Sequence, residues 1–248
     1  MQIYRSKHNN PAWNLAAEEW LLQSGQDALF LYVNDASVIL GCNQAIAREV
    51  DLAYCQAHQI SVCRRISGGG AVYHDAGNLN FCFVGPRDAG VLSKDFLQPV
   101  LTILSRMGIE ATIGERKDLW IGSRKITGTA SHYTKQRALQ HGTLLFDSNL
   151  EQLHAALGLE IAPDESVRLS EQKRALSLRA VHSQPSPVVN LRAFLPGNME
   201  AKAFFDNFAR LSCAYFQSSM QTFSEQEEAE IARLAEQKYR QHAWIFKR

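Results

Sequence analysis

Three consecutive glycines, Gly68, Gly69 and Gly70, constrain the fold of this chain more than any other feature. They follow the sequence RRIS, residues 64–67, and precede AVYHD, residues 71–75. Consecutive glycines cost backbone entropy, so folded proteins keep them where the chain turns sharply or where something approaches the backbone closely. Successive N–H groups can then converge on an anion, and arginine offers planar donors to phosphate or carboxylate. The stretch predicts an anion-binding loop between two strands; the alternative is a simple turn with solvated arginines.

The glycine stretch does not match either of the two common nucleotide-binding patterns. No GK[ST] follows it, which excludes a P-loop, and GxGxxG is absent, which excludes a dinucleotide fingerprint. A serine nucleophile elbow, GxSxG, is also absent. The eight histidines show neither HxH nor HExxH spacing, so the sequence does not favour a structural zinc site.

Two further segments carry side chains suited to chemistry. Lys125 lies in RKITGTA, residues 124–130, where a strand lysine is followed by a small, glycine-containing stretch. Gly122 and Ser123 predict a two-residue hairpin turn, which would place Trp120 opposite Lys125 on one face. His141-Gly142-Thr143 leads into an apolar strand. Taken alone, a strand lysine is usually solvated and a histidine at the start of a strand is usually a packing residue.

Composition limits the class of protein. The chain has 248 residues, of which 46% are hydrophobic and 21% charged, which is typical of a globular protein and excludes a disordered tail or a disulfide-framed mini-protein. Lys and Arg total 26 against 25 Asp and Glu, so no general nucleic-acid binding is expected. The apolar runs are too short for a membrane helix, and the N-terminus does not read as a signal peptide. Five cysteines without CxxC spacing fit reduced thiols and a cytoplasmic location.

The hydrophobic pattern predicts an α+β fold with a mixed, largely antiparallel sheet flanked by helices. A helix is expected to begin at Asn10-Pro11 and to end at Gly25, and Ser224 with Glu227 forms a capping box for a C-terminal helix. Residues 157–198 are expected to form an irregular basic segment. We expect a single domain over residues 1–248. The expected strands are listed here by residue number: 28–33, 37–40, 60–63, 71–73, 79–84, 110–113, 118–121, 124–127 and 139–146.

The three segments in this order resemble the lipoate–protein ligase family. The likeness rests on RRISGGGAVYHDAGNLNF from residue 64, KDLW with RKITGTASH from residue 117, and HGTLLFDSNL from residue 141. The sequence NLAAEE from Asn14 is similar to the first helix of that family, and VILG followed by Gln44 to its early strand. The resemblance covers most of residues 1–157. It implies the catalytic-domain fold shared by lipoate and biotin ligases.

The resemblance implies a two-step reaction with ATP, Mg²⁺ and lipoate. Lipoate attacks the α-phosphate of ATP to give lipoyl-AMP, and a lysine of a lipoyl carrier domain then takes the lipoyl group. Lys125 matches the lysine that bridges carboxylate and α-phosphate, and Asp118 a position near Mg²⁺. The implied residues for ATP and lipoyl-AMP are Arg65, Ser67, Gly68, Gly69, Gly70, Ala71, Val72, Tyr73, Asn78 and Lys125. Those for lipoate are Gly70, Lys125, Gly128, His141, Gly142 and Thr143.

The implied partners are lipoyl domains of 2-oxoacid dehydrogenase complexes or the H protein of glycine cleavage. The chain stops at WIFKR, so we expect no accessory domain, or a separate accessory polypeptide. The sequence departs from the family at Cys42, where arginine is common, and at Lys117, where asparagine is common. Two alternatives stay open. One is an octanoyl or lipoyl transferase acting through a cysteine thioester, although Cys82 reads as a structural thiol. The other is a non-catalytic lipoate-binding relative.

Overall fold

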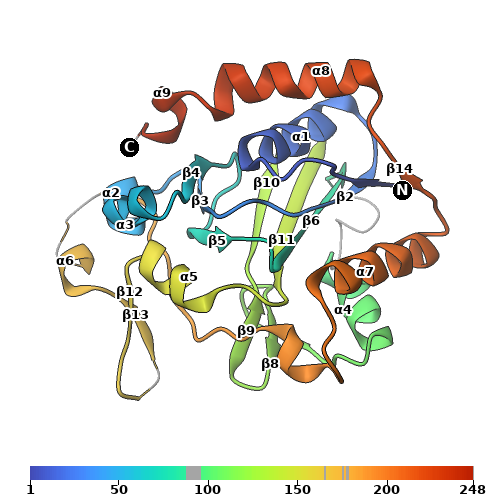
Figure 1. Ribbon diagram of the computed structural model, residues 1–248. Coiled ribbons are helices and arrows are strands. Elements are labelled where there is room, and N and C mark those ends of the chain that lie inside the picture. Colours follow the sequence, from blue (N-terminus) through green and yellow to red (C-terminus); the bar gives the residue numbers. More distant parts are fainter. Residues whose placement is uncertain (88–95, 165, 175, 177–178, 248) are drawn as a thin grey trace.

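A six-stranded sheet forms the centre of the protein in a computed structural model that describes residues 1–87, 96–164, 166–174, 176 and 179–247 (Figure 1). The strand order is β10-β11-β6-β2-β1-β14. Neighbours from β10 to β2 run antiparallel, whereas β1 is parallel to both β2 and β14. The expected mixed, largely antiparallel sheet is thus confirmed. Its strands are β1 (Gln2–Arg5), β2 (Ala28–Tyr32), β6 (Asn78–Pro86), β10 (Thr129–Tyr133), β11 (Arg137–Leu145) and β14 (Met220–Gln221).

Three smaller sheets lie beside the central one. The first has the order β4-β3-β5 and consists of β3 (Ser37–Leu40), β4 (Ser61–Arg64) and β5 (Val72–His74). The second is the antiparallel ribbon of β7 (Thr112–Ile113), β8 (Leu119–Ile121) and β9 (Arg124–Thr127). The third is the hairpin of β12 (Leu159–Ile161) and β13 (Val167–Leu169). The glycine stretch connects β4 to β5, so it is a loop between two strands, as expected.

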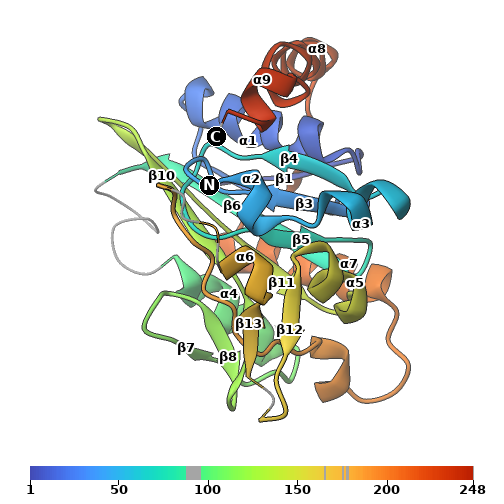
Figure 2. The same ribbon diagram turned by 90° about the vertical axis from the view of Figure 1, so that its left-hand side faces the viewer.

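Helices cover both faces of the central sheet. On one face lie α1 (Pro11–Ser24) and α8 (Glu225–Leu234), which a π-turn over Ala235–Tyr239 links to α9 (His242–Ile245). On the other lie α4 (Leu97–Arg106) and α7 (Ala201–Phe216) (Figures 1 and 2). The remaining helices are short: α2 (Ile46–Glu49), α3 (Leu52–Ala57), α5 (Leu150–Ala156), α6 (Glu171–Arg174) and a 3₁₀ turn at Leu191–Phe194.

Local sequence signals set both ends of α1 and the start of α8. The Asn10 side chain accepts a hydrogen bond from the Trp13 N–H, and Gly25 ends α1 in the left-handed region at φ +82°. Ser224 and Glu227 form the expected capping box of α8. These signals act within four residues, so these three helix ends follow from sequence alone.

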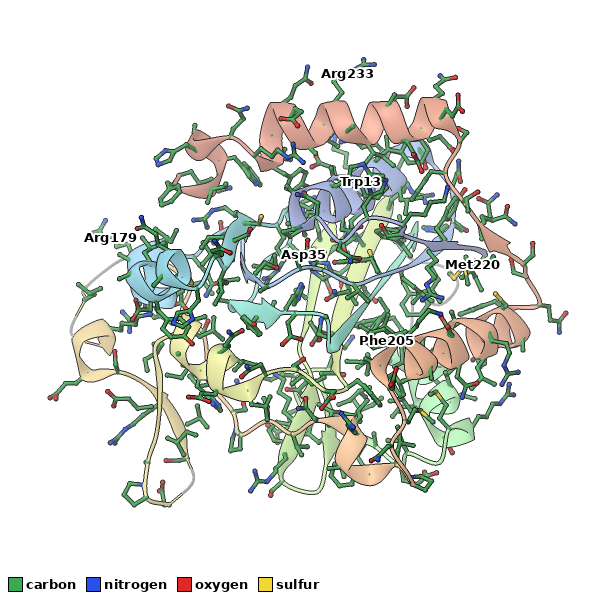
Figure 3. The ribbon with its side chains drawn as sticks, in the orientation of Figure 1. Trp13, Asp35, Arg179, Phe205, Met220 and Arg233 are labelled. Atoms are coloured by element: carbon green, nitrogen blue, oxygen red, sulfur yellow. The ribbon has the colours of Figure 1, made fainter. Side chains whose placement is uncertain are left out.

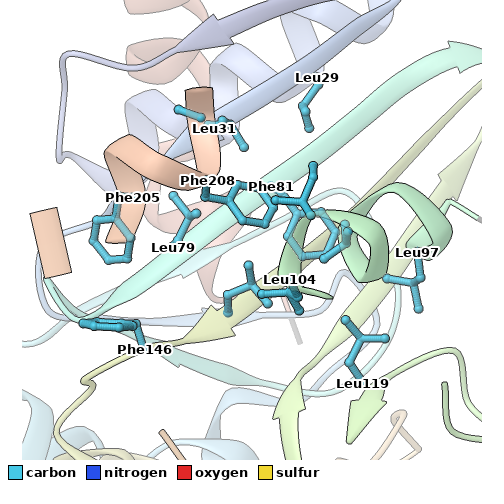
Figure 4. Close-up of a cluster of buried hydrophobic side chains, with 14 of the residues drawn as sticks. Leu29, Leu31, Leu79, Phe81, Leu97, Leu104, Leu119, Phe146, Phe205 and Phe208 are labelled. Carbon is cyan, nitrogen blue, oxygen red and sulfur yellow. The ribbon is translucent and has the colours of Figure 1, made fainter. Parts of the chain in front are cut away.

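Alternating side chains of β2 divide the core into two layers. Leu29 and Leu31 join the apolar cluster under α4 and α7, whereas Ala28, Phe30 and Tyr32 join the cluster under α1 and α8. Figure 4 shows the first cluster, in which phenylalanines of α7 meet leucines of β2 and β6. On the outside, Arg233 of α8 points into solvent (Figure 3). Burial on both faces explains why β2 has no polar positions.

The structure corrects three parts of the expected fold. Residues 157–198 are not irregular throughout, because they include β12, β13 and α6; residues 165, 175 and 177–178 of that segment lie outside the described residues. Strands β1, β10 and β14 of the central sheet were not among the expected strands. The short helix α2 was not expected either. Among the described residues, none of the helices combines the length and apolar character needed to cross a membrane.

Candidate active site

The predicted segments meet around one cavity of about 360 Å³. Its wall comes from the glycine loop and β5, from the β9–β10 ribbon, from β11, and from residues 181–188, which we call the strap. The predicted residues that line it are Arg65, Gly69, Gly70, Ala71, Val72, Tyr73, Asp118, Lys125, Gly128, His141, Gly142 and Thr143. Arg65 and Lys125 thus share a common hollow, although 60 residues separate them in the chain.

The conformation and close packing of the glycine loop require glycine at Gly69 and at Gly41, on which the loop rests. Gly69 has φ +82°, which a side chain would rarely adopt. A Cβ atom on Gly41 would lie 2.2 Å from the Gly69 carbonyl oxygen, and the Cys42 N–H donates to Ser67 O at 2.9 Å. The loop therefore rests directly on the end of β3.

Arg65 holds the loop from inside, which differs from the expected role. Its guanidinium donates to the carbonyl oxygens of Ile39, Gly68 and Gly70 and to Ser67 Oγ, at 2.5 to 2.9 Å. Four of its five N–H groups are used in this way. Burial lowers the pKa of Arg65 to about 10. The prediction that Arg65 presents its planar donors to an anion is therefore wrong for most of them: the chain uses them to shape the loop.

The buried carboxylate of Glu18 is connected to Arg65 by hydrogen bonds through His141 and Ser67. Glu18 accepts from His141 Nδ1 at 2.8 Å and from the Tyr32 hydroxyl at 2.9 Å. On the other side of the ring, His141 Nε2 lies 2.7 Å from Ser67 Oγ, which also accepts a hydrogen bond from Arg65. Glu18 is 1% exposed and Ser67 0%. The series has the order of a Ser–His–carboxylate triad, but the buried Ser67 holds Arg65 and cannot reach a substrate.

Lys125 reaches the cavity from the second predicted segment. In the β8–β9 hairpin Trp120 pairs with Lys125, as the Gly122-Ser123 turn predicted. Lys125 Nζ lies 3.0 Å from Asp118 Oδ2, and Trp120 Nε1 donates to Asp118 Oδ1 at 2.8 Å. Burial raises the pKa of Asp118, but hydrogen bonds from Trp120 and Lys125 together with the charge of Lys125 outweigh it, so the net pKa is lowered.

Both carboxylate oxygens of Asp118 are engaged in this structure, and its expected role near Mg²⁺ stays a prediction. Each of its carboxylate oxygens already accepts from an N–H donor, Lys125 on one side and Trp120 on the other. Asp118 is an acceptor that orients Lys125.

Three predicted residues do not reach the cavity wall. Ser67 and Gly68 lie behind it, where both accept hydrogen bonds from Arg65. Asn78 is fully buried and donates to Asn80 Oδ1 at 3.0 Å, so it supports β6. Their sequence positions next to a functional loop gave no information on which way each would face.

Sequence reasoning missed the strap and its partners. Ser183 Oγ accepts from the Ala71 N–H at 2.9 Å and from Gln44 Nε2 at 3.0 Å, and the Ser183 N–H donates to the buried carboxylate of Glu49. The strap also pairs with β9, since the Lys125 N–H donates to Pro187 O at 2.9 Å. It therefore ties the glycine loop to the strand of Lys125. No motif in residues 157–198 indicated that Ser183 would bind the glycine loop.

Another missed residue is His74, which also lines the cavity. Asn34 Nδ2 donates to its Nδ1 at 2.9 Å, because the Asn34 Oδ1 already accepts from Asn14. Burial, with the nearby charges of Arg65 and His141, lowers the pKa of His74 to about 3. The ring is therefore neutral near pH 7. The HD sequence after the glycine loop was its only signal.

Sequence comparison finds one family model and several curated relatives with matching names. A family model described as the lipoyl protein ligase A/B catalytic domain matches residues 10–211. Lipoate–protein ligase 1 of Staphylococcus aureus is 33% identical over 251 residues, which cover 99% of this chain and 73% of that protein. Lipoate-protein ligase LplJ of Bacillus subtilis is 37% identical over 207 residues, or 82% of this chain and 59% of that protein. The chain thus spans only part of the length of these relatives.

Solved structures superpose over nearly the whole chain. A lipoate-protein ligase A bound with ATP gives a TM-score of 0.79 at 26% identity, covering 99% of this chain and 98% of that one. Protein Ta0514 of Thermoplasma acidophilum with bound lipoic acid gives 0.78 at 25%, covering 100% and 99%. A bi-partite lipoate protein ligase from the same organism, reported with its E2 lipoyl domain, gives 0.77 at 27%, covering 99% and 95%.

Proposed function

This chain belongs to the lipoyl protein ligase A/B catalytic-domain family, and we propose that it activates lipoate with ATP and transfers the lipoyl group to a protein lysine. The expected family and the expected class of enzyme are confirmed by relatives named lipoate–protein ligases. Similar structures with bound ATP and with bound lipoic acid support both substrates. We also propose that residues 1–248 act as one catalytic domain, because α8, near the C-terminus, packs against α1, near the N-terminus.

One observation carries the proposal: the Lys125 ammonium group and the glycine loop face the same cavity. In the first step a lipoate carboxylate oxygen attacks the α-phosphorus of ATP, and pyrophosphate leaves. Two anions must approach each other, and a fixed ammonium group lowers that repulsion without reorganising solvent. Asp118, 3.0 Å away, holds Lys125 in position for this role. In the second step the amine of the acceptor lysine attacks the acyl carbon, and AMP leaves.

The other residues divide into two sets in this proposal. Residues Gly70 to Tyr73 bind the nucleotide, in a loop that Arg65 shapes and that Ser183 holds at the Ala71 N–H. Gly128, His141, Gly142 and Thr143 line the part of the cavity that takes the acyl chain. Gly142 cannot carry a side chain, because a Cβ atom would lie 2.5 Å from the ring of the buried Phe81. Mg²⁺ enters as the counter-ion of ATP, as part of the substrate.

The proposed acceptors are lipoyl carrier domains, such as those of 2-oxoacid dehydrogenase complexes or the glycine-cleavage H protein. A similar bi-partite ligase reported with its E2 lipoyl domain supports this class of partner. A thioester route through Cys82 is disfavoured, because burial and the neighbouring Glu18 raise the pKa of that thiol well above its ordinary value.

The test is a reaction of this chain alone with ATP, Mg²⁺, lipoate and an unlipoylated E2 lipoyl domain. We expect lipoate-dependent pyrophosphate release and a lipoyl mass adduct on the acceptor lysine. The variant Lys125→Met should release no pyrophosphate above background. Lipoate binding by calorimetry without any pyrophosphate release would instead identify a non-catalytic binding protein, and an acyl adduct on a cysteine of the enzyme would identify an acyl transferase.

A further inference from the structure

Basic residues are concentrated in the segment that lines one side of the cavity. Residues 115–137, which we call the basic ribbon, contain six Lys or Arg and two Asp or Glu, whereas the rest of the chain has 20 basic and 23 acidic residues. Two of these bases are ion-paired, Lys125 with the buried Asp118 and Arg137 with Asp27, whereas Lys117 and Lys135 are exposed. The near-neutral charge of the whole chain therefore hides a positive surface beside the candidate active site.

The basic ribbon extends well beyond the cavity. Lys125 and Thr127 to Ala130 line the cavity, and β10 then continues to Tyr133, followed by Lys135 in the exposed turn before β11. Ten residues of extended chain from Arg124 to Tyr133 span about 30 Å. The exposed Lys117 lies beside the start of β10, because its carbonyl oxygen accepts from Thr129 Oγ1 at 2.5 Å. A nucleotide is too small to contact charges spread over this length.

Strand β10 is also an edge of the central sheet. It pairs with β11 on one side, and among the described residues no strand pairs with its other side. Figure 2 shows β10 and the β7–β8 ribbon along the same side of the molecule. Near the end of the strand, Tyr133 is 50% exposed and the guanidinium of Arg87 lies 5.5 Å from the centre of its ring. Tyrosine and arginine are the residue types that most often dominate protein–protein interfaces.

We propose that the basic ribbon is the docking surface for the acceptor protein, which binds it through an acidic surface around its target lysine. This inference rests on the proposed function, because that reaction requires a folded protein to bring a lysine to the cavity. The occupant must be large enough to reach both Lys117 and Lys135 and must carry the opposite charge. An acidic carrier domain meets both conditions, and its approach along β10 leads its lysine toward Thr129, where the ribbon enters the cavity.

The test compares two charge-reversal variants in the two half-reactions. Lys117→Glu/Lys135→Glu changes the basic ribbon, and Lys7→Glu/Lys202→Glu makes the same change in net charge at exposed lysines near α8 and on α7. Lipoate-dependent ATP–pyrophosphate exchange measures the first step without an acceptor. Transfer from preformed lipoyl-AMP to an unlipoylated E2 lipoyl domain measures the second.

We expect unchanged exchange in both variants, and for the ribbon variant a rise of about tenfold in KM for the acceptor at low ionic strength. The difference from the unmodified protein should shrink as salt is added, because salt screens exposed charges. An unchanged KM for the acceptor, or an equal rise in the control variant, would overturn the docking surface. A rise in KM for ATP instead would assign the charges to the nucleotide. Absence of exchange in the unmodified protein would refute the proposed function itself.

Discussion

Replacing Lys125 with methionine tests how much the ion pair between Lys125 and Asp118 contributes to the stability of the fold. At first sight a strand lysine should be replaceable at little cost in stability. In the structure, however, the Lys125 side chain is 21% exposed and that of Asp118 only 5%, with their charged atoms 3.0 Å apart. Removing the lysine leaves a buried carboxylate with Trp120 as its remaining side-chain donor.

The size of the effect follows from that burial. A fully buried carboxylate that loses its partner costs about 3–5 kcal/mol, and an exposed ion pair contributes about 0–1 kcal/mol. Because Lys125 is partly exposed and Asp118 keeps two donors, Trp120 and its backbone, we expect a loss of about 2 kcal/mol. For a chain of this length that lowers Tm by about 4–8 °C. Thermal unfolding followed by circular dichroism at pH 7 measures it.

The pH dependence separates this explanation from a simple packing defect. Because its pKa is lowered in the folded state, Asp118 stabilises the fold above its unfolded pKa, and this stability is lost as pH falls through the folded pKa. The methionine variant lacks two causes of that lowering. Its deficit in Tm should therefore be largest near pH 7 and shrink as pH falls through the lowered pKa of Asp118, below which the carboxyl group is protonated in both proteins.

Two control variants complete the experiment. Asp118→Asn combined with Lys125→Met removes both charges, so it should recover most of the lost Tm while pyrophosphate release stays absent. Lys135→Met, at an exposed turn, should change neither. A deficit in Tm that stays the same as pH falls through the lowered pKa of Asp118, or no rescue in the double variant, would refute the reasoning.

Three further predictions follow from the packing of the site. Gly41→Ala should weaken ATP binding at least tenfold, because its Cβ would meet a loop carbonyl at 2.2 Å, whereas Gly68→Ala, with nothing within 4 Å, should bind as before; calorimetric titration compares them. His74 is deprotonated in the fold down to about pH 3 but takes a proton near pH 6.5 when unfolded, so stability should fall as pH drops below about 6.5. Chemical denaturation at several pH values measures the free energy of unfolding, and its fall with decreasing pH should be smaller in His74→Gln. With an aromatic disulfide reagent at pH 8, the partly exposed Cys42 should react in the native protein. Burial raises the pKa of Cys63 to about 12, so Cys63 should react only after unfolding. Equal reaction rates of the two thiols in the native protein would contradict the burial of Cys63.

Local signals in the sequence determined the helix ends and the turns. Asn10 and Ser224 cap their helices through hydrogen bonds to residues three positions ahead, and the Gly122-Ser123 turn brings Trp120 opposite Lys125. Such contacts depend on backbone geometry over a few residues, so their residue types are sufficient to predict them. The alternating and helical hydrophobic patterns likewise predicted a helix-flanked sheet, and the ordered motifs predicted the family.

Only the tertiary structure decided which way the polar groups of the site face. The two ends of the Glu18–His141 hydrogen bond lie 123 residues apart, and the Ala71–Ser183 bond joins residues 112 apart. Arg65 could equally have turned its donors toward the cavity; packing turned them toward the Ile39, Gly68 and Gly70 carbonyls instead. A buried donor bonds whichever acceptor the folded chain brings within about 3 Å, and that depends on how sheets and loops meet in space.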